Sequence, residues 1–315
     1  MIVTVTLNPS LDQTLEVDVL ARGDINKTAP ARLDPGGKGV NVARALAGNG
    51  VPAVAVLPIG GSNGEVVLHL LDRQSVTAAV VRIAGTTRAN VTIIEHDGTT
   101  TKLNEPGPTL SEQEVADVMA AVADHAAAGG WIVAGGSLPP ELDGRVYGML
   151  TEIATAAGAR LAIDTSGPAL RAALAHRPHL IKPNAAELAE AVGWPLATVG
   201  DVIKACRDLQ HAGAGDVLCS LGRDGAVLTS ADEVWFARGP DVTVVNTVGA
   251  GDAMLAGALF AGGRGAAALR NGVAWATSAV ATTGTGVPLG DAIPADAVHL
   301  TADPDPSQPL TEEHS

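Results

Sequence analysis

The sequence is poor in several residue types, and each scarcity limits what the protein can be. Only 2% of its 315 residues are aromatic, so the core has to be built from small aliphatic side chains packed at close range. Its 20 lysines and arginines are outnumbered by 34 acidic residues, which leaves a net charge of −14. Extended contact with nucleic acid or an anionic membrane needs many cationic side chains, so neither partner is expected.

Cysteine is also scarce. Cys206 and Cys219 form neither a disulfide framework nor a Cys-x-x-Cys pair, which fits a reduced compartment. The closest histidines, His176 and His179, are separated by Pro178, so a histidine metal site is not expected. The sequence has no basic leader and no run of about 18 apolar residues, so we expect a cytoplasmic protein without membrane spans.

Short apolar runs alternate with helical patterns along most of the chain. Examples of the runs are residues 2–7, 53–59 and 160–163, and a clear helix candidate spans residues 111–128. This alternation predicts an α/β fold with a doubly wound, mainly parallel sheet and helices on both faces. The 46% hydrophobic content is sufficient for one large domain, which we place at residues 1–300.

Two segments break this rhythm and read as β-ribbons outside the helix-strand pattern. They cover residues 12–34 and 86–104, the second with alternating apolar residues and a turn. We expect them to pair into a small β-sheet lid over the carboxyl edge of the main sheet, where ligands bind in such folds. Exposed lid strands could pair across a homodimer. Residues 301–315 have little to bury, and we expect a disordered tail.

The segment from residue 242 to Asp252 is the strongest candidate for chemistry. It reads as a strand over residues 242–246, then a glycine turn, then a helix that starts near Asp252. Backbone N–H groups of Gly249, Ala250, Gly251 and Asp252 could stabilise an anion there, and the Asp252 carboxylate could take a proton. The structural alternative is an acidic residue that merely suits a first helical turn. Met254 breaks the dinucleotide pattern G-x-G-x-x-G.

Two further segments have residues suited to anions. Gly36 and Gly37 precede Lys38 and Asn41 at a helix start, where the backbone can approach a ligand closely and Lys38 can neutralise a phosphate. A plain connecting loop explains that segment about as well. The residues Lys182-Pro-Asn-Ala-Ala-Glu187 open another helix, and they would be read alone as a capping box.

Taken together, the segments resemble ribokinase-like (PfkB-type) carbohydrate kinases over roughly residues 2–290. The motifs that carry the resemblance, in family order, are Asn8-Pro-Ser-Leu-Asp12, Gly36-Gly-Lys-Gly-Val-Asn41, Asp164-Thr-Ser-Gly167, Lys182 to Glu187, Ser220-Leu-Gly222 and Gly249-Ala-Gly-Asp252. Residues 87–91 and 101–108 look like the 1-phosphofructokinase branch, with tagatose-6-phosphate kinases and the minor 6-phosphofructokinases as near relatives.

The resemblance implies a role for each matching residue. It makes Asp252 the general base, with Gly249, Ala250 and Gly251 as its anion hole. The implied substrate-binding residues are Asp12, Gly37, Lys38, Asn41, Arg88, Ser137 and, more weakly, Lys27. The implied ATP-binding residues are Lys182, Asn184, Glu187, Ser220, Gly222, Gly225, Asn271 and Ser278. Glu187 would also hold Mg²⁺ through water. The family often has Asp where this chain has Asn246, which weakens the expectation of a monovalent cation.

The resulting hypothesis is an ATP-dependent kinase that converts fructose 1-phosphate to fructose 1,6-bisphosphate. The same residues could hold a phosphate at the other end of the sugar, so tagatose-6-phosphate or fructose-6-phosphate kinase is the alternative. A sugar-phosphate-binding regulator without turnover is a hypothesis of a different class, and the intact Asp252 and glycine turn argue against it.

Overall fold

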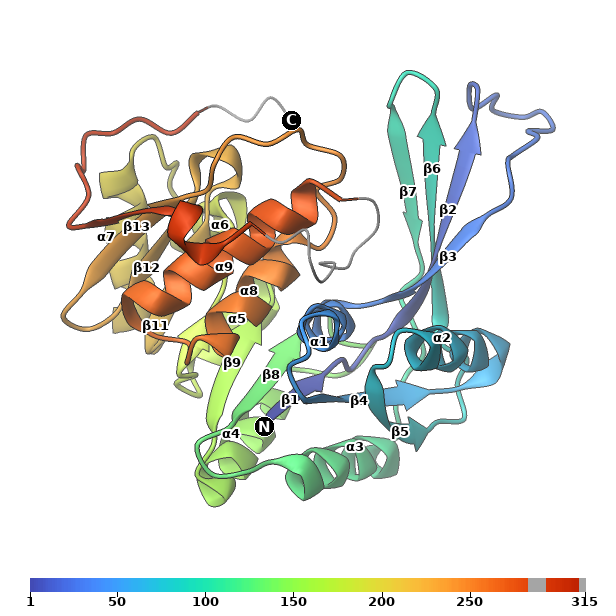
Figure 1. Ribbon diagram of the computed structural model, residues 1–315. Helices are drawn as coiled ribbons and strands as arrows, with labels where there is room; N and C mark the ends of the chain where they lie inside the picture. The colour runs from blue at the N-terminus through green and yellow to red at the C-terminus, as the bar shows by residue number, and fades with distance from the viewer. Residues whose placement is uncertain (283–292, 312–315) are drawn as a thin grey trace.

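The computed structural model describes residues 1–282 and 293–311 and shows a large layered domain with a small sheet projecting from it (Figure 1). The strands are β1 (Ile2–Val5), β2 (Ser10–Val17), β3 (Arg32–Gly36), β4 (Ala53–Ile59), β5 (Thr77–Arg82), β6 (Arg88–Glu95), β7 (Thr100–Asn104), β8 (Trp131–Gly135), β9 (Arg160–Asp164), β10 (Leu180–Ile181), β11 (Asp216–Ser220), β12 (Ala226–Thr229), β13 (Val234–Arg238) and β14 (His299–Ala302). The helices are α1 (Lys38–Gly48), α2 (Gly61–Arg73), α3 (Glu112–His125), α4 (Arg145–Ala157), α5 (Gly167–Leu174), α6 (Ala185–Val192), α7 (Val199–His211), α8 (Ala250–Phe260) and α9 (Gly265–Val280).

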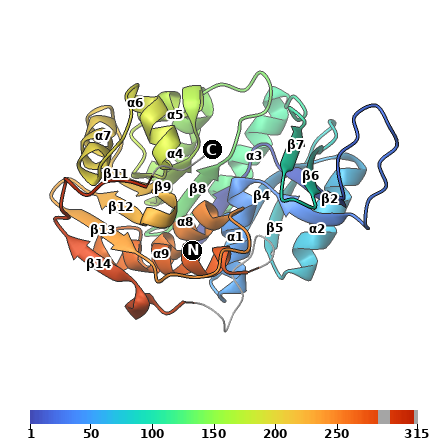
Figure 2. The ribbon, with the colours of Figure 1, turned by 90° about the horizontal axis from the view of Figure 1, so that it is seen from above.

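The main sheet confirms the predicted doubly wound α/β fold. Its ten strands run in the order β14-β13-β12-β11-β10-β9-β8-β1-β4-β5, parallel from β11 to β5 and antiparallel from β11 to β14. Successive strand residues alternate between two core layers, one against α3 to α7 and the other against α1, α2, α8 and α9. The view from above shows these helices on opposite faces of the sheet (Figure 2).

The small sheet combines the two predicted ribbons. Its order is β3-β2-β6-β7, with β2 and β6 parallel over residues 10–17 and 88–95. The two central strands, β2 and β6, start next to the main domain, and their first residues, Ser10 and Arg88, are register partners. The sheet therefore begins at the carboxyl edge of the main sheet and extends away from it (Figure 1).

Glycines on α8 and α9 allow the two helices to pack closely, because a side chain at either position would collide with the other helix. A Cβ added at Gly257 would lie 2.6 Å from the Asn271 carbonyl oxygen and 2.8 Å from the ring of Trp275. A Cβ at Gly272 would lie 2.9 Å from the Met254 carbonyl oxygen. Beside these contacts the rings of Phe260 and Trp275 stack with centroids 5.5 Å apart. The position of α8 is therefore fixed by close packing along its length.

The structure corrects the strand predicted over residues 242–246. This segment is irregular, with Val244 and Val245 61% and 51% exposed, and the Val245 N–H donates to the carbonyl of Val280 at the end of α9. Beyond β13 the chain leaves the sheet and leads into α8. The valines of this segment match the residue pattern of a strand, but no neighbouring strand in the described part of the chain pairs with them, so no strand forms.

The structure also differs from the predicted disordered tail for residues 301–311. β14 pairs with β13, and the following residues lie across the start of α7, where the Val199 N–H donates to the Gln308 carbonyl. Thr311 donates both its backbone N–H and its hydroxyl to Asp224 at 2.6 Å. These bonds, together with Leu310 packed against the core, order a segment that has few apolar side chains. Residues 312–315 lie outside the described residues.

None of the helices within residues 1–282 and 293–311 has the length and apolarity needed to cross a bilayer. Helices α2 and α5 were not predicted because the glycines at the start of α2 and the pair Gly167-Pro168 at the start of α5 obscure the periodicity.

Candidate active site

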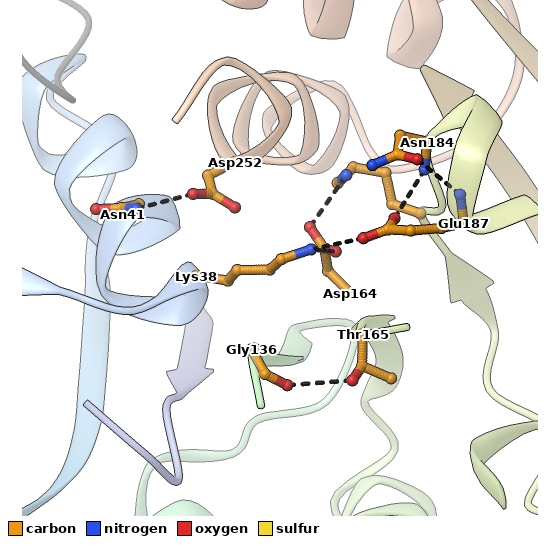
Figure 3. A network of polar contacts seen from close by, with 9 residues as sticks. Lys38, Asn41, Gly136, Asp164, Thr165, Asn184, Glu187 and Asp252 are labelled. Atoms are coloured by element: carbon orange, nitrogen blue, oxygen red, sulfur yellow. Dashed lines mark hydrogen bonds and ion pairs between the residues drawn. The ribbon is translucent and has the colours of Figure 1, made fainter. Parts of the chain in front are cut away.

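The carboxyl ends of the central strands bring four charged side chains together, of which Lys38, Asp164 and Asp252 are labelled in Figure 3. Asp164 ends β9, Lys182 follows β10 directly, and Lys38 and Asp252 lie in the first turns of α1 and α8. Parallel strands direct their carboxyl ends, and the helices that follow them, to one edge of the sheet, so residues up to 214 positions apart meet there. All but Lys38 are buried.

Asp164 is held between two lysines. Its Oδ1 accepts a hydrogen bond from Lys38 Nζ at 2.5 Å, and its Oδ2 lies 3.1 Å from Lys182 Nζ. Burial alone would raise the pKa of Asp164, but the two ammonium groups outweigh burial and keep the pKa below its ordinary value. In the same way, the carboxylates of Asp164 and Glu187 outweigh burial and raise the pKa of Lys38. Asp164 and Lys38 are therefore ionised at neutral pH.

Asp252 has a different environment. Its Oδ2 accepts one hydrogen bond, from Asn41 Nδ2 at 2.8 Å. Burial, and then the negative charge of Asp164, raise the pKa of Asp252 to about 7. Lys182, the bond from Asn41 and Lys38 oppose that shift. A carboxylate whose pKa lies near neutrality suits a general base, because about half of it is ionised at neutral pH and it binds a proton strongly enough to accept one.

The glycine turn before Asp252 lies beside a cation. Gly249 has φ 82°, a left-handed conformation that favours glycine, and it is the N-cap of α8. A Cβ at Gly251 would lie 3.2 Å from Lys182 Nζ, so the start of α8 and the ammonium group face the same space. The partial positive charge of the helix start and the Lys182 charge together can stabilise an anion next to Asp252.

The predicted nucleotide side is assembled from α6 and the turn after β11. Asn184 and Glu187 form the expected capping box. The backbone of Asn184 also forms an isolated parallel β-bridge with Ser220, at the end of β11. Glu187 Oε2 is engaged by the Asn184 N–H, while its Oε1 lies 3.6 Å from Lys38 Nζ and faces the site. Gly222 (φ 57°) and Gly225 (φ 106°) shape the turn, and a Cβ at 225 would lie 2.1 Å from the Ala237 carbonyl oxygen.

Glu187 fits the expected magnesium ion held through water, because one carboxylate oxygen remains directed at the charged cluster. Within the described ranges, no three His, Cys, Asp or Glu side chains converge as a ready-made metal centre. Magnesium would therefore depend on the phosphates of a nucleotide as further ligands, as is common for this ion.

Asn271 and Ser278 lie on α9, and their side chains are already engaged. Asn271 Nδ2 donates to the Ala267 carbonyl at 2.9 Å. The buried Ser278 hydroxyl donates to the Ala274 carbonyl and accepts from the Ile293 N–H at 2.6 Å. Both side chains thus bond within the protein, and Ser278 is not exposed for adenine contact.

The predicted sugar side lies where the lid meets the domain. Asp12 Oδ1 accepts from Ser10 at 2.7 Å and from Asn90 at 3.0 Å, and its carboxylate occupies the space where Gly36 would carry a Cβ. Gly37, with φ 118°, turns the chain into α1. The adjacent strands β2, β3 and β6 therefore present Asp12 toward the start of α1.

Arg88 and Ser137 lie together at the same junction. Arg88 Nη2 donates to the Asn8 carbonyl at 3.1 Å and lies 3.4 Å from Ser137 Oγ, while Nη1 donates to the Glu105 carbonyl. Burial lowers the pKa of Arg88, but a guanidinium stays charged. Lys27 is exposed on the connection between β2 and β3, which joins the lid ends farthest from Ser10.

Two residues point elsewhere than expected. Lys38 and Asn41 were assigned to the sugar's far side, yet Lys38 extends to Asp164 and Asn41 bonds the base (Figure 3). Sequence reasoning also gave no role to Asp164, although a charged residue at the end of the apolar strand Leu161-Ala-Ile is itself a signal of a ligand edge.

Comparisons with known proteins agree with this geometry. A model of the pfkB family carbohydrate kinases matches residues 5–292. The 1-phosphofructokinase of Rhodobacter capsulatus is 40% identical over 264 residues, covering 82% of this chain and 83% of that protein. The ATP-dependent 6-phosphofructokinase isozyme 2 of Escherichia coli K12 is 37% identical over 258 residues, covering 81% and 83%.

Solved structures give the same result. The crystal structure of phosphofructokinase-2 from Escherichia coli in complex with potassium superimposes with a TM-score of 0.84 at 33% identity and covers 91% of this chain and 94% of that one. Because the family model spans most of the chain and the shared fold brings the matched motifs to one sheet edge, this protein belongs to the pfkB family of carbohydrate kinases.

Proposed function

We propose that the protein transfers the γ-phosphoryl group of ATP to the free primary hydroxyl of fructose 1-phosphate, giving fructose 1,6-bisphosphate and ADP. The observation that carries the proposal is Asp252, a buried carboxylate with a pKa of about 7 beside a helix start and Lys182. The choice of sugar is supported by the relative named 1-phosphofructokinase.

In the proposed reaction Asp252 takes the hydroxyl proton as the substrate oxygen attacks the γ-phosphorus, and the bond to the ADP oxygen breaks. The start of α8 and Lys182 stabilise charge on the transferred group. Bound with ATP, Mg²⁺ would neutralise charge on the phosphates. Glu187 would orient its water ligands, and Lys38 would stay anchored by Asp164.

On the sugar side, Asp12 would accept hydrogen bonds from neighbouring hydroxyls. Arg88 and Ser137 would face the substrate's existing phosphate, for which the guanidinium offers a planar fork. The lid would cover the sugar and exclude water, which limits hydrolysis of ATP.

The alternative substrates are fructose 6-phosphate and tagatose 6-phosphate. The relative named ATP-dependent 6-phosphofructokinase isozyme 2 supports fructose 6-phosphate as the stronger of these two alternatives. The test is ADP release by purified protein with each sugar phosphate separately. We expect fructose 1-phosphate to be preferred at least about tenfold in kcat/KM, or about 1.4 kcal/mol of transition-state discrimination. Turnover of none would contradict the kinase proposal and leave a non-catalytic binder.

We also propose a cytoplasmic enzyme that forms a homodimer through its lid. The two buried thiols, Cys206 and Cys219, are free, which fits a reducing compartment. Leu33 and Leu103 on the outer lid strands β3 and β7 are 38% and 58% exposed. Sedimentation of the protein and of a Leu103→Glu variant tests the dimer, since an inserted charge should shift the protein to monomer.

A further inference from the structure

Arg44 is a buried arginine of α1 that lies between the lid and the candidate base. It is 8% exposed. Its Nη2 lies 3.5 Å from Asp34 Oδ1, and its Nη1 donates to the Pro35 carbonyl at 3.4 Å. Both partners belong to lid strand β3, in which Asp34 is the direct register partner of Asp12. The guanidinium thus holds β3, the strand paired with the proposed sugar-binding residue Asp12.

The same guanidinium reaches the amide next to the base. Arg44 Nη1 donates to Asn41 Oδ1 at 3.3 Å, and Asn41 Nδ2 donates to Asp252 Oδ2 at 2.8 Å. A guanidinium can only donate and an ionised carboxylate can only accept, so both neighbours select the same amide orientation. Without the guanidinium, only the Asp252 carboxylate would select this amide orientation, and it would do so only while it is ionised.

We propose that Arg44 is a positioning residue that orients the Asn41 amide toward Asp252 and ties that orientation to the lid strand carrying Asp34. The proposal deepens the kinase function above and rests on it, because the base needs a fixed donor only if it takes a proton. Asn41 touches the base directly, and Arg44 acts through it.

The charges around both ends set the expected direction of a pH effect. Asp252 faces Asp164, Lys182 and Lys38, in addition to Asn41. Arg44 faces Asp34, Asp12, Arg32 and, more weakly, Asp252. The bond from Asn41 favours the ionised form of Asp252, so its loss raises the pKa of Asp252. Disturbing Arg44 should therefore move the acidic limb of the kcat profile to higher pH.

The test is a double-mutant cycle of Arg44→Lys and Asn41→Ala, measured as kcat and KM with ATP and the best sugar phosphate. Arg44→Lys keeps the buried charge, but its single ammonium cannot bridge Asn41 and Asp34 as the planar fork does. We expect kcat to fall about tenfold with KM for ATP within about twofold of wild type. In the Asn41→Ala background the same replacement should change kcat less than about twofold.

Equal losses of kcat in both backgrounds, or an unmoved acidic limb, would overturn the proposal and leave Arg44 a structural residue. Arg82→Gln is the matched control, since Arg82 pairs with Glu65 on the surface and should leave kcat unchanged. If Arg44→Lys does not fold, Asp34→Asn tests the lid end. It should lower kcat about threefold, and only when Asn41 is present. Wild-type turnover is measured alongside, so failure of the kinase function itself is seen separately.

Discussion

Two buried carboxylates at the same sheet edge illustrate how local surroundings decide a role. Asp164, at the end of β9, is 1% exposed and sits between two ammonium groups that lower its pKa. Asp252, at the start of α8, is 7% exposed, has one amide donor and has its pKa raised to about 7. The residue type and depth are alike, yet only Asp252 can exchange a proton near neutral pH. Asp164 is suited to hold cations in place.

Removing the base is the strongest test of the different roles assigned to Asp252 and Asp164. Asp252→Asn keeps the shape but cannot take a proton, so kcat should fall about 10³-fold. Affinity for ATP, measured by calorimetry, should stay within a few-fold because Lys182 and Glu187 are untouched. A variant that keeps most of kcat would show that proton removal does not depend on Asp252.

Replacing the other carboxylate tests the coupling between the two. Asp164→Asn frees Lys38 and Lys182 and removes the charge that, after burial, raises the pKa of Asp252. We expect kcat/KM for ATP to fall about 10- to 100-fold as the lysines lose their anchor. At the same time the acidic limb of kcat should move to lower pH.

Asp216→Asn is the matched control for that change. Asp216 is a buried aspartate of β11 whose Oδ2 lies 2.9 Å from Arg264 Nε, and it lies at the opposite, amino end of its strand. Its replacement should leave the pH profile where it was. If both variants shift the limb alike, the shift reflects overall charge and not the charge of Asp164 close to Asp252.

The wild-type pH profile sharpens the same contrast. Because the pKa of Asp252 is raised to about 7, the ionised base is lost as pH falls through 7. We therefore expect kcat to decrease roughly tenfold per pH unit below that value and to level off above it. A profile that stays flat down to about pH 5 would mean that Asp252 has an ordinary pKa.

The smallest expected effect concerns the helix that carries Asp252. Gly257→Ala inserts a methyl group where the Asn271 carbonyl and the Trp275 ring already touch the glycine. Overpacking of this kind costs about 1–3 kcal/mol of unfolding free energy. Chemical denaturation measures the cost, and kcat should fall a few-fold as α8 shifts from Asn41. Unchanged stability would show that α8 and α9 can separate easily.

Much of this arrangement could be predicted from the sequence, because local patterns encode it. The alternation of strands and helices gave the sheet, the two ribbons gave the lid, and the Asn184 and Glu187 pattern gave a capping box that the structure confirms. Asp252 was predicted from its glycine turn and from the motifs found with it.

What could not be predicted depends on long-range contacts. Lys38 and Asn41 belong to one helix start, but their partners, Asp164 and Asp252, are 126 and 211 residues away. Residues 301–311 have few apolar side chains, and long-range contacts order them: pairing with β13, backbone bonds at the start of α7, packing of Leu310 on the core and bonds from Thr311 to Asp224. Residues 242–246 carry strand-forming valines but meet no strand, so tertiary context overrides propensity there.

The stack of Trp275 on Phe260 gives the protein a built-in optical reporter. Trp275 is 7% exposed and packs against Gly257 of α8, the helix whose first turn carries the candidate base. Indole emission depends on the polarity and packing around the ring, so a displacement of α8 should change its intensity or colour. With four tryptophans in the chain, a variant that retains only Trp275 would let nucleotide and sugar binding be followed by fluorescence, without an added dye.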